Sequence, residues 1–265
     1  MNKIIWPITG VVFIKTHVNE LEFFKNDKVY RASVCYCFIP TLIYNEELLK
    51  FLHENEKKYY NSLIYDRRRK SYLLGRYSAK MAISLLTGED NLKKILIQQG
   101  IFNQPVNCYY NTGNIQVSIA HSDELGAAIA FPEASPMGID VEKIDPKKTE
   151  VLQSQITKEE FVLFKNLHLS CEKILTLLWS TKESLSKVLK TGLTIPFQIY
   201  EISAIEVYQN HVITYFKNFR QYRTVSFTLG RYICSISYPK LLDLKFDVQS
   251  MNFLFDSNQY DELVI

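Results

Sequence analysis

The chain has 265 residues, enough for one large domain or two small ones with a sizeable core. Its hydrophobic fraction of 47% and charged fraction of 22% are ordinary for a globular protein, and a net charge of +3 is too small to indicate nucleic-acid binding. Five cysteines without a C-x-x-C pair argue against a disulfide framework or a zinc site, and no apolar run approaches the ~18 residues that span a bilayer, so we expect a soluble cytoplasmic protein.

Two helices are expected after an early strand. The segment VYRASVCYCFI (29–39) is typical of a β-strand, and Asn45 is placed to cap a helix over residues 46–60. A second helix is predicted over about residues 66–86, ending at Gly88.

Basic side chains are concentrated on the second of these helices. It begins with four consecutive cations, Arg67 to Lys70, and continues with Arg76 and Lys80 at i,i+4 spacing. Cations at a helix N-terminus oppose the helix dipole, and an anionic ligand would offset that cost. Two interpretations stay open, a solvated helix end and an anion-binding surface.

A histidine lies near the turn of a predicted β-hairpin. Strands over 115–120 and 126–131 flank the segment HSDE, which places His121 at a strand end. A lone histidine in such a place is more often structural or solvated than part of a site.

Two carboxylates share one face of a later strand, GIDVEK (138–143). Side chains alternate along a strand, so Asp140 and Glu142 point to one side while Ile139 and Val141 point into the core. The alternative is an exposed polar strand face. Two such carboxylates repel each other unless a cation neutralises them, and Mg²⁺ is the hard cation that oxygen ligands suit.

A Thr157-x-x-Glu160 capping box opens a short helix, and a longer one follows over about residues 170–190. On the longer helix Glu183 and Lys187 are four residues apart, so they share a face opposite the apolar stripe. Taken alone they could be an ordinary solvated ion pair. Lys182 projects at the edge of the apolar sector, where a charge needs a partner or a route to solvent.

These features together suit phosphate chemistry. Three carboxylates, Asp140, Glu142 and Glu183, could hold one Mg²⁺ ion, and Lys187 lies one helical turn from the last of them. No P-loop or G-x-G-x-x-G motif is present, so the sequence does not support a mononucleotide or dinucleotide site of these familiar kinds.

A faint internal repeat accompanies them. The segments VSIAHSDELGAAIAFP and VSFTLGRYICSISYP lie about a hundred residues apart. The pattern of each predicts a strand, a turn and a second strand that ends at a proline. We therefore predict an α+β fold of two similar halves, each with antiparallel strands packed with helices. The expected domains are residues 1–136, residues 137–240 and a C-terminal extension over 241–265.

At this point the sequence resembles the Sfp-type 4′-phosphopantetheinyl transferase family, with enterobactin-type members included. The G-[IV]-D-[IV]-E motif followed some 40 residues later by W-x-x-K-E-[SA]-x-x-K is very specific, and the resemblance runs from about residue 50 to about 240. The matching stretches are SIAHSDELGAAIA (118–130), GIDVEK (138–143), WSTKESLSKVLKTGL (179–193) and, more distantly, RRRKSYLLGRYSAK (67–80).

The resemblance implies a fold and an activity. The fold is a pseudo-twofold pair of α+β halves with the site between them. The protein is expected to be a monomer. The enzyme is a holo-[acyl-carrier-protein] synthase, which moves the phosphopantetheine arm of coenzyme A to a serine of an acyl or peptidyl carrier protein and releases adenosine 3′,5′-bisphosphate. Such enzymes serve fatty-acid, polyketide or other secondary-metabolite synthesis, and neither nucleic acid nor a membrane is an expected partner.

The resemblance also implies residue roles. Glu183, directly or through a metal-bound water, would take the proton of the carrier serine, and Lys187 would stabilise the pyrophosphate. The expected ligands of Mg²⁺, with Mn²⁺ as an alternative, are Asp140, Glu142 and Glu183. The expected contacts to coenzyme A are Arg69, Lys70, Arg76, Lys80, His121, Ser122 and Lys187.

One departure and two alternatives remain. Many members carry a G-K-P segment where this chain has Asn103-Gln104-Pro105, which lacks the lysine and leaves the 3′-phosphate contacts open. The alternatives are a Mg²⁺-dependent coenzyme A pyrophosphatase and a non-catalytic relative that binds coenzyme A or a carrier protein.

Overall fold

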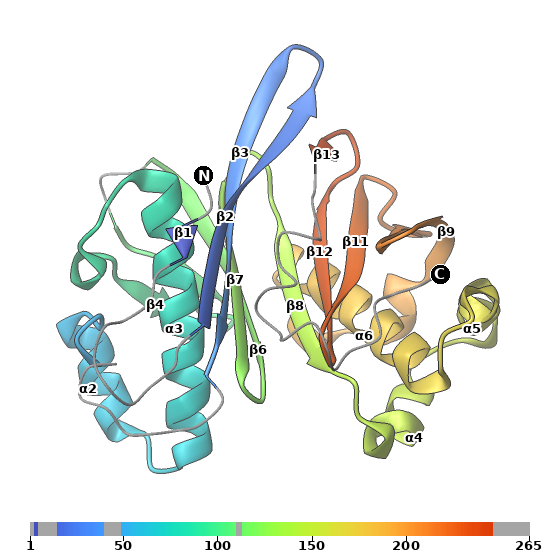
Figure 1. The fold of residues 1–265 in the computed structure, drawn as a ribbon, viewed down its shortest axis with the longest axis horizontal. Helices are drawn as coiled ribbons and strands as arrows, with labels where there is room; N and C mark the ends of the chain where they lie inside the picture. The colour runs from blue at the N-terminus through green and yellow to red at the C-terminus, as the bar shows by residue number, and fades with distance from the viewer. Residues whose placement is uncertain (1–2, 5–14, 40–48, 110–112, 246–265) are drawn as a thin grey trace. The chain divides into compact units, whose positions relative to one another are not determined.

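A computed structural model describes residues 3–4, 15–39, 49–109 and 113–245 of the chain. The chain divides into two compact units, Met1–Pro136 and Met137–Ile265, which are described separately (Figure 1). No helix in the described ranges is long and apolar enough to cross a membrane.

The first unit is an antiparallel sheet packed against one long helix. Its strands follow the order β1-β2-β3-β7-β6. The strands are β1 (Lys3–Ile4), β2 (Lys15–Lys25), β3 (Lys28–Phe38), β6 (Ile115–Ser122) and β7 (Leu125–Pro132), with a separate ladder of β4 (Ile97–Gln99) and β5 (Pro105–Asn107). Helix α3 (Asp66–Thr87) lies along β7, β3 and β6, and the shorter α2 (Glu54–Ser62) precedes it (Figure 1).

The second unit repeats this layering. Its strands follow the order β8-β12-β11-β10-β9, all antiparallel. The strands are β8 (Gly138–Lys143), β9 (Ile202–Tyr208), β10 (His211–Phe216), β11 (Tyr222–Leu229) and β12 (Tyr232–Pro239), with β13 (Asp243–Lys245) after them. The helices are α4 (Thr149–Gln153), α5 (Lys158–Phe164) and α6 (Cys171–Val188), of which α6 packs on β12, β8 and β11. Short 3₁₀ turns are η1 (Leu92–Lys94), η3 (Pro146–Lys148), η4 (Lys165–Leu167), η5 (Gly192–Thr194) and η6 (Phe197–Tyr200).

The two units share an arrangement of three strands and one helix, although their sheets extend on different sides of it. In the first, β3 pairs with β7, β7 pairs with β6, and α3 covers all three strands. In the second, β8 pairs with β12, β12 pairs with β11, and α6 covers all three. The predicted α+β class with two pseudo-symmetric halves, each an antiparallel sheet packed with helices, is confirmed.

Helix α6 lies unusually close to its sheet. A Cβ atom at Gly138 in β8 would lie 2.2 Å from the carbonyl oxygen of Ser184 in α6, so only glycine permits this approach. Small hydroxyl side chains fill the same interface and bond to one another, with Ser184 Oγ 2.7 Å from Ser237 Oγ and Thr181 Oγ1 3.0 Å from Ser226 Oγ. Because these side chains are short, β8 and α6 bring their functional groups within direct contact.

The predicted continuous helix over 46–60 is interrupted, since residue 49 is helical but the next helical residue described is Glu54. Asn45 lies outside the described residues, and residues 50–53 are not helical. Helix α2 begins at Glu54, where the His53 side chain accepts from the Asn55 backbone N–H at 3.1 Å. The carbonyl of Phe51 accepts a hydrogen bond from Lys80 at 2.9 Å, so a tertiary contact takes the group that a continuous helix would need.

Candidate functional site

Strand β8 and helix α6 bring a carboxylate and an ammonium together. Lys187 Nζ lies 2.7 Å from Asp140 Oδ1 and donates to the carbonyl of Ile139 at 3.0 Å. The Asp140 side chain is buried, and its Oδ2 atom has no hydrogen-bond partner within the described part of the chain. An uncompensated oxygen of this kind is costly, so it indicates a ligand or ion that the site would receive.

Glu142 lies two residues further along β8 and is engaged by a different lysine. Lys148 Nζ, from the 3₁₀ turn after the strand, lies 3.0 Å from Glu142 Oε2. Burial, and then the charge of Asp140, raise the pKa of the Glu142 carboxyl. Lys148 was not among the residues predicted from sequence, although its place just beyond the D-x-E strand is a signal that could have indicated it.

Glu183 faces the same group of charges from α6. Burial raises the pKa of Glu183 to about 7, the negative charge of Asp140 adds to the rise, and the ammonium of Lys187 opposes it. Glu142 raises the pKa further. A carboxylate with a pKa near neutrality is suited to accept a proton from a hydroxyl nucleophile.

The three carboxylates offer the oxygen ligands that a hard cation prefers, but their side chains are not arranged around one point. Within the described residues, no three His, Cys, Asp or Glu side chains are grouped as a metal site. Asp140 and Glu142 each pair with a lysine instead. The partnerless Asp140 oxygen and the mutual repulsion that raises the pKa of Glu183 are what a bound cation would relieve. The assignment of Asp140, Glu142 and Glu183 as metal ligands stays a prediction.

Lys182, the charged residue at the edge of the apolar stripe, has a buried partner. Its Nζ lies 2.8 Å from Glu160, and neither side chain is exposed. Burial lowers the pKa of Lys182, while Glu160 raises it. Glu160 also completes the predicted capping box, since it accepts from the backbone N–H of Thr157 at 2.9 Å. Lys182 therefore has a structural role that joins α5 to α6.

In the first unit, Arg76 and His121 line one cavity of about 270 Å³. Arg68 also lines it, so the basic stretch of α3 contributes a residue that the predicted set did not include. The remaining lining residues are Tyr59, Leu63, Ser71, Tyr72, Gly75, Gln98, Gln99, Asn103, Pro105 and Ile119. Two arginines and a histidine around one cavity suit an anionic ligand.

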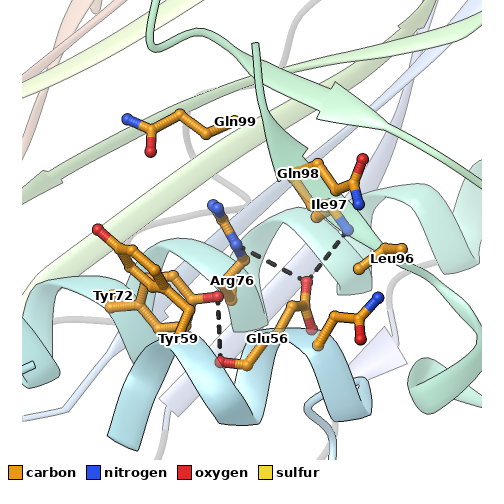
Figure 2. Close-up of a pocket in the computed structure, with 9 residues that line it drawn as sticks. Glu56, Tyr59, Tyr72, Arg76, Leu96, Ile97, Gln98 and Gln99 are labelled. Atoms are coloured by element: carbon orange, nitrogen blue, oxygen red, sulfur yellow. Dashed lines mark hydrogen bonds and ion pairs between the residues drawn. The ribbon is translucent and has the colours of Figure 1, made fainter. Parts of the chain in front are cut away.

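A second cavity of about 390 Å³ adjoins the first through shared walls (Figure 2). The residues that line both are Tyr59, Tyr72, Arg76, Gln98 and Gln99. Arg76 therefore stands at the boundary of the two cavities, with its guanidinium carbon 4.7 Å from the centre of the Tyr72 ring.

The other predicted contacts to coenzyme A lie elsewhere. Arg69 donates from Nε to the carbonyl of Leu63 at 2.8 Å and, like Lys70 and Ser122, does not line either cavity. Lys80 is fully buried, 2.6 Å from Glu56, and donates to two backbone carbonyls. The prediction that Lys80 binds coenzyme A is therefore corrected, because its ammonium is occupied inside the protein.

Of three comparisons with known proteins, the family model supports the predicted motifs. A family model described as the 4′-phosphopantetheinyl transferase superfamily matches residues 136–237, which include β8, α6 and their charged side chains. A crystal structure of holo-[acyl-carrier-protein] synthase from Thermotoga maritima aligns with a TM-score of 0.30 and 14% identity, over 54% of this chain and 74% of that one. No curated protein matches the sequence.

Proposed function

We propose that this chain, whose residues 136–237 belong to the 4′-phosphopantetheinyl transferase superfamily, moves the phosphopantetheine arm of coenzyme A to a serine of an acyl or peptidyl carrier protein. The family supports a coenzyme A-dependent transferase in general terms, and the carrier protein and the released adenosine 3′,5′-bisphosphate are the proposed specific substrate and product. The observation that supports the proposal most is the contact between Asp140 of β8 and Lys187 of α6, beside Glu142 and Glu183.

Each charged side chain has a role in this reaction. Glu183 takes the proton of the carrier serine, whose oxygen then bonds to the phosphorus next to the pantetheine. The bond from that phosphorus to the bridging oxygen breaks, and Lys187 stabilises the charge that collects on the departing nucleotide. Asp140 holds the Lys187 ammonium in place through their 2.7 Å contact.

The carboxylates would also hold a divalent cation. Mg²⁺ bound by Asp140, Glu142 and Glu183 would neutralise pyrophosphate charge and make the nucleotide a better leaving group. In the first unit, Arg68, Arg76 and His121 would bind a phosphate of coenzyme A. Ser122, Arg69 and Lys70 remain candidates only for contacts outside the cavity.

The test is a transfer assay read by mass. The protein is incubated with coenzyme A, Mg²⁺ and an apo carrier protein, and the carrier is expected to gain about 340 Da, the mass of one phosphopantetheine arm. Coenzyme A cleavage without a gain in carrier mass would favour the pyrophosphatase alternative. Binding without either reaction would favour the non-catalytic alternative.

The role of Glu183 is tested by Glu183→Gln, which removes the proton acceptor and changes little in shape. We expect a fall in transfer rate of about 10²–10⁴-fold. Glu150→Gln, the same change at an exposed position of α4, is the matched control and should retain full activity. An active Glu183→Gln variant would contradict the assigned base.

A further inference from the structure

Both units contain the same buried ion pair. In the first, Glu56 of α2 lies 2.6 Å from Lys80 of α3, and in the second, Glu160 of α5 lies 2.8 Å from Lys182 of α6. None of the four side chains is more than 1% exposed. Each glutamate is the third residue of a helix that opens with a capping box, and each lysine belongs to the helix that covers the sheet.

The two glutamates also hold corresponding backbone groups. Glu56 accepts from the N–H of His53 at 2.9 Å and from the N–H of Ile97 at 3.1 Å. Glu160 accepts from the N–H of Thr157 and of Ile202, both at 2.9 Å. In each unit, one buried carboxylate therefore ties a short helix, the long helix and the first residue of a strand together.

The first unit adds a second cation to this arrangement. Arg76, one helical turn before Lys80, has its Nε atom 3.7 Å from Glu56 Oε1, and its side chain is 15% exposed (Figure 2). The residue one turn before Lys182 in the second unit is Leu178, which is buried and apolar. The arginine is thus a feature of the first unit alone, at the position that the two long helices share.

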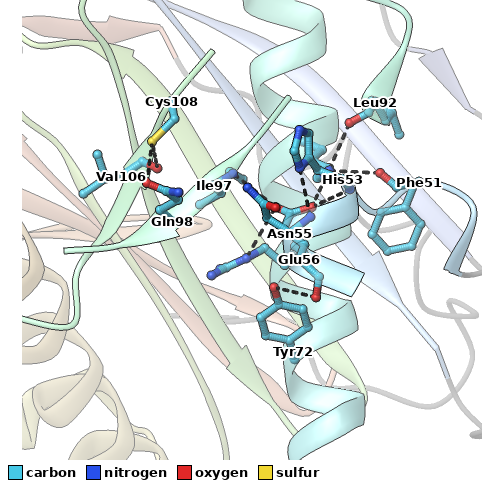
Figure 3. A network of polar contacts seen from close by, with 12 residues as sticks. Phe51, His53, Asn55, Glu56, Tyr72, Leu92, Ile97, Gln98, Val106 and Cys108 are labelled. Carbon is cyan, nitrogen blue, oxygen red and sulfur yellow. Dashed lines mark hydrogen bonds and ion pairs between the residues drawn. The ribbon is translucent and has the colours of Figure 1, made fainter. Parts of the chain in front are cut away.

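Arg76 is held on two sides. Its guanidinium lies over the ring of Tyr72, whose hydroxyl donates to the backbone carbonyl of Glu56 at 3.4 Å (Figures 2 and 3). Figure 2 shows the terminal nitrogens of Arg76 directed away from Glu56, while its buried Nε atom faces the carboxylate as an ion pair without a hydrogen bond among the described residues. One carboxylate facing two cations leaves this part of the cavity wall positive.

We propose that Glu56 is a positioning residue that holds Arg76 at the boundary of the two cavities and so sets the affinity of the first unit for a phosphate-bearing ligand. This inference rests on the proposed function, in which the ligand is coenzyme A. Glu56 does not touch the ligand in this role. Glu56 acts through Arg76. Without the Glu56 carboxylate, the Arg76 guanidinium is no longer held in the position from which it contacts the phosphate.

The variant Glu56→Gln tests the proposal, with Glu160→Gln as the matched control. Both changes remove one charge from the same buried arrangement, but only the first affects an arginine. We expect the dissociation constant of adenosine 3′,5′-bisphosphate, measured by titration calorimetry, and the KM for coenzyme A to rise about five- to tenfold in Glu56→Gln, with kcat within about twofold. In Glu160→Gln, the dissociation constant should stay within about twofold of the wild-type value.

Each outcome decides the matter. Unchanged or tighter binding in Glu56→Gln overturns the proposal, because loss of a negative charge without loss of positioning would only strengthen anion binding. Weaker binding in both variants also overturns it, since the effect would then come from the shared ion pair. If Glu56→Gln does not fold, Glu56→Gln/Lys80→Met removes both buried charges and is measured in its place. If the wild-type protein neither binds the nucleotide nor transfers the arm, the proposed function fails as well, whereas wild-type binding with no change in the variant overturns the inference alone.

Discussion

Lys182 shows how a charged residue can be placed inside the second unit. Its ammonium and the Glu160 carboxylate neutralise each other without any solvent contact. Replacing Lys182 with Met leaves Glu160 as an unpaired buried charge, and we expect a loss of about 3–5 kcal/mol in the free energy of unfolding. Urea denaturation measures this loss.

The control for this prediction is Lys173→Met, a change at a partly exposed position of the same helix, which should cost far less. The double variant Lys182→Met/Glu160→Gln removes both charges and should recover much of the stability that the single change loses. Equal destabilisation by Lys182→Met and Lys173→Met would show that the buried pair has no special importance.

His17 makes stability depend on pH. It is fully buried in β2, and burial lowers its pKa from about 6.5 to about 4. The unfolded chain therefore binds more protons than the folded chain between these two values, so stability falls as the pH drops below 6.5. At about pH 5 the loss is about 2 kcal/mol relative to neutral pH.

The variant His17→Gln isolates this contribution, because glutamine does not titrate. Unfolding free energies of both proteins are measured at neutral pH and near pH 5. The wild type should lose about 2 kcal/mol more than the variant between the two conditions. A parallel decline of the two proteins would contradict the assignment.

Residue-scale predictions from periodicity and spacing succeeded where a contact is local, and the contact of Asp140 with Lys187 was anticipated only through the family motifs. The capping box at Thr157 and Glu160 spans three residues, and the structure confirms it. The partner of Lys80 is Glu56, 24 positions away in another helix, and i,i+4 spacing with Arg76 predicted the wrong environment. Periodicity indicates which face a side chain occupies, but it does not say what covers that face.

At the scale of elements, the closeness of β8 to α6 governs the catalytic cluster. A methyl group on Gly138 would meet the backbone of Ser184 at 2.2 Å and Val188 Cγ2 at 2.9 Å. Because backbone cannot move aside as a side chain can, Gly138→Ala should separate the strand from the helix and lengthen the contact of Asp140 with Lys187. We expect a loss of at least about 2 kcal/mol in unfolding free energy and a fall in transfer rate.

Gly75→Ala is the comparison for stability. Its added methyl would meet only Ile119 Cγ2, at 3.0 Å, and that side chain can adjust. Thermal unfolding of both variants and of the wild type gives the result. A Gly138→Ala protein as stable and as active as the wild type would show that α6 and β8 have room to separate without consequence.

The elements themselves were predictable to different degrees. Helix α6 and strand β8 lie where the apolar stripe and the alternating pattern placed them. The opposite arc of α6 is not a solvated face, however, because Ser186 is buried and Glu183 and Lys187 are only partly exposed. The polar arc of α6 faces the charged side chains of β8. The pattern of one helix alone does not reveal such a partner.

At the scale of the whole molecule, the weak repeat seen in the sequence corresponds to a repeated arrangement of strands. The two matching hairpin segments are β6–β7 and β11–β12, and the second strand of each pairs with a third strand, β3 or β8. The sheets differ beyond these strands, since β6 is at the edge of its sheet whereas β11 also pairs with β10. The buried pairs Glu56–Lys80 and Glu160–Lys182 repeat as well, although the residues around them differ. The repeat is therefore seen in the pairing of three strands and in one buried ion pair of each unit.

The two units differ in the charged groups that they carry. The carboxylates and Lys187 belong to the second unit, and the cavity with Arg68, Arg76 and His121 belongs to the first. A single chain therefore carries both the proposed catalytic cluster and a candidate phosphate-binding cavity, each in its own unit. A second copy of the chain would add no kind of group that one copy lacks.

We therefore expect a monomer in solution. Sedimentation or light scattering should give a mass near 31.0 kDa that does not rise with protein concentration. The transfer rate per chain should likewise stay constant on dilution, because no residue of the proposed site comes from a partner. A mass of twice this value, together with activity that falls on dilution, would show that the site is completed between subunits and that the two units of one chain are not sufficient.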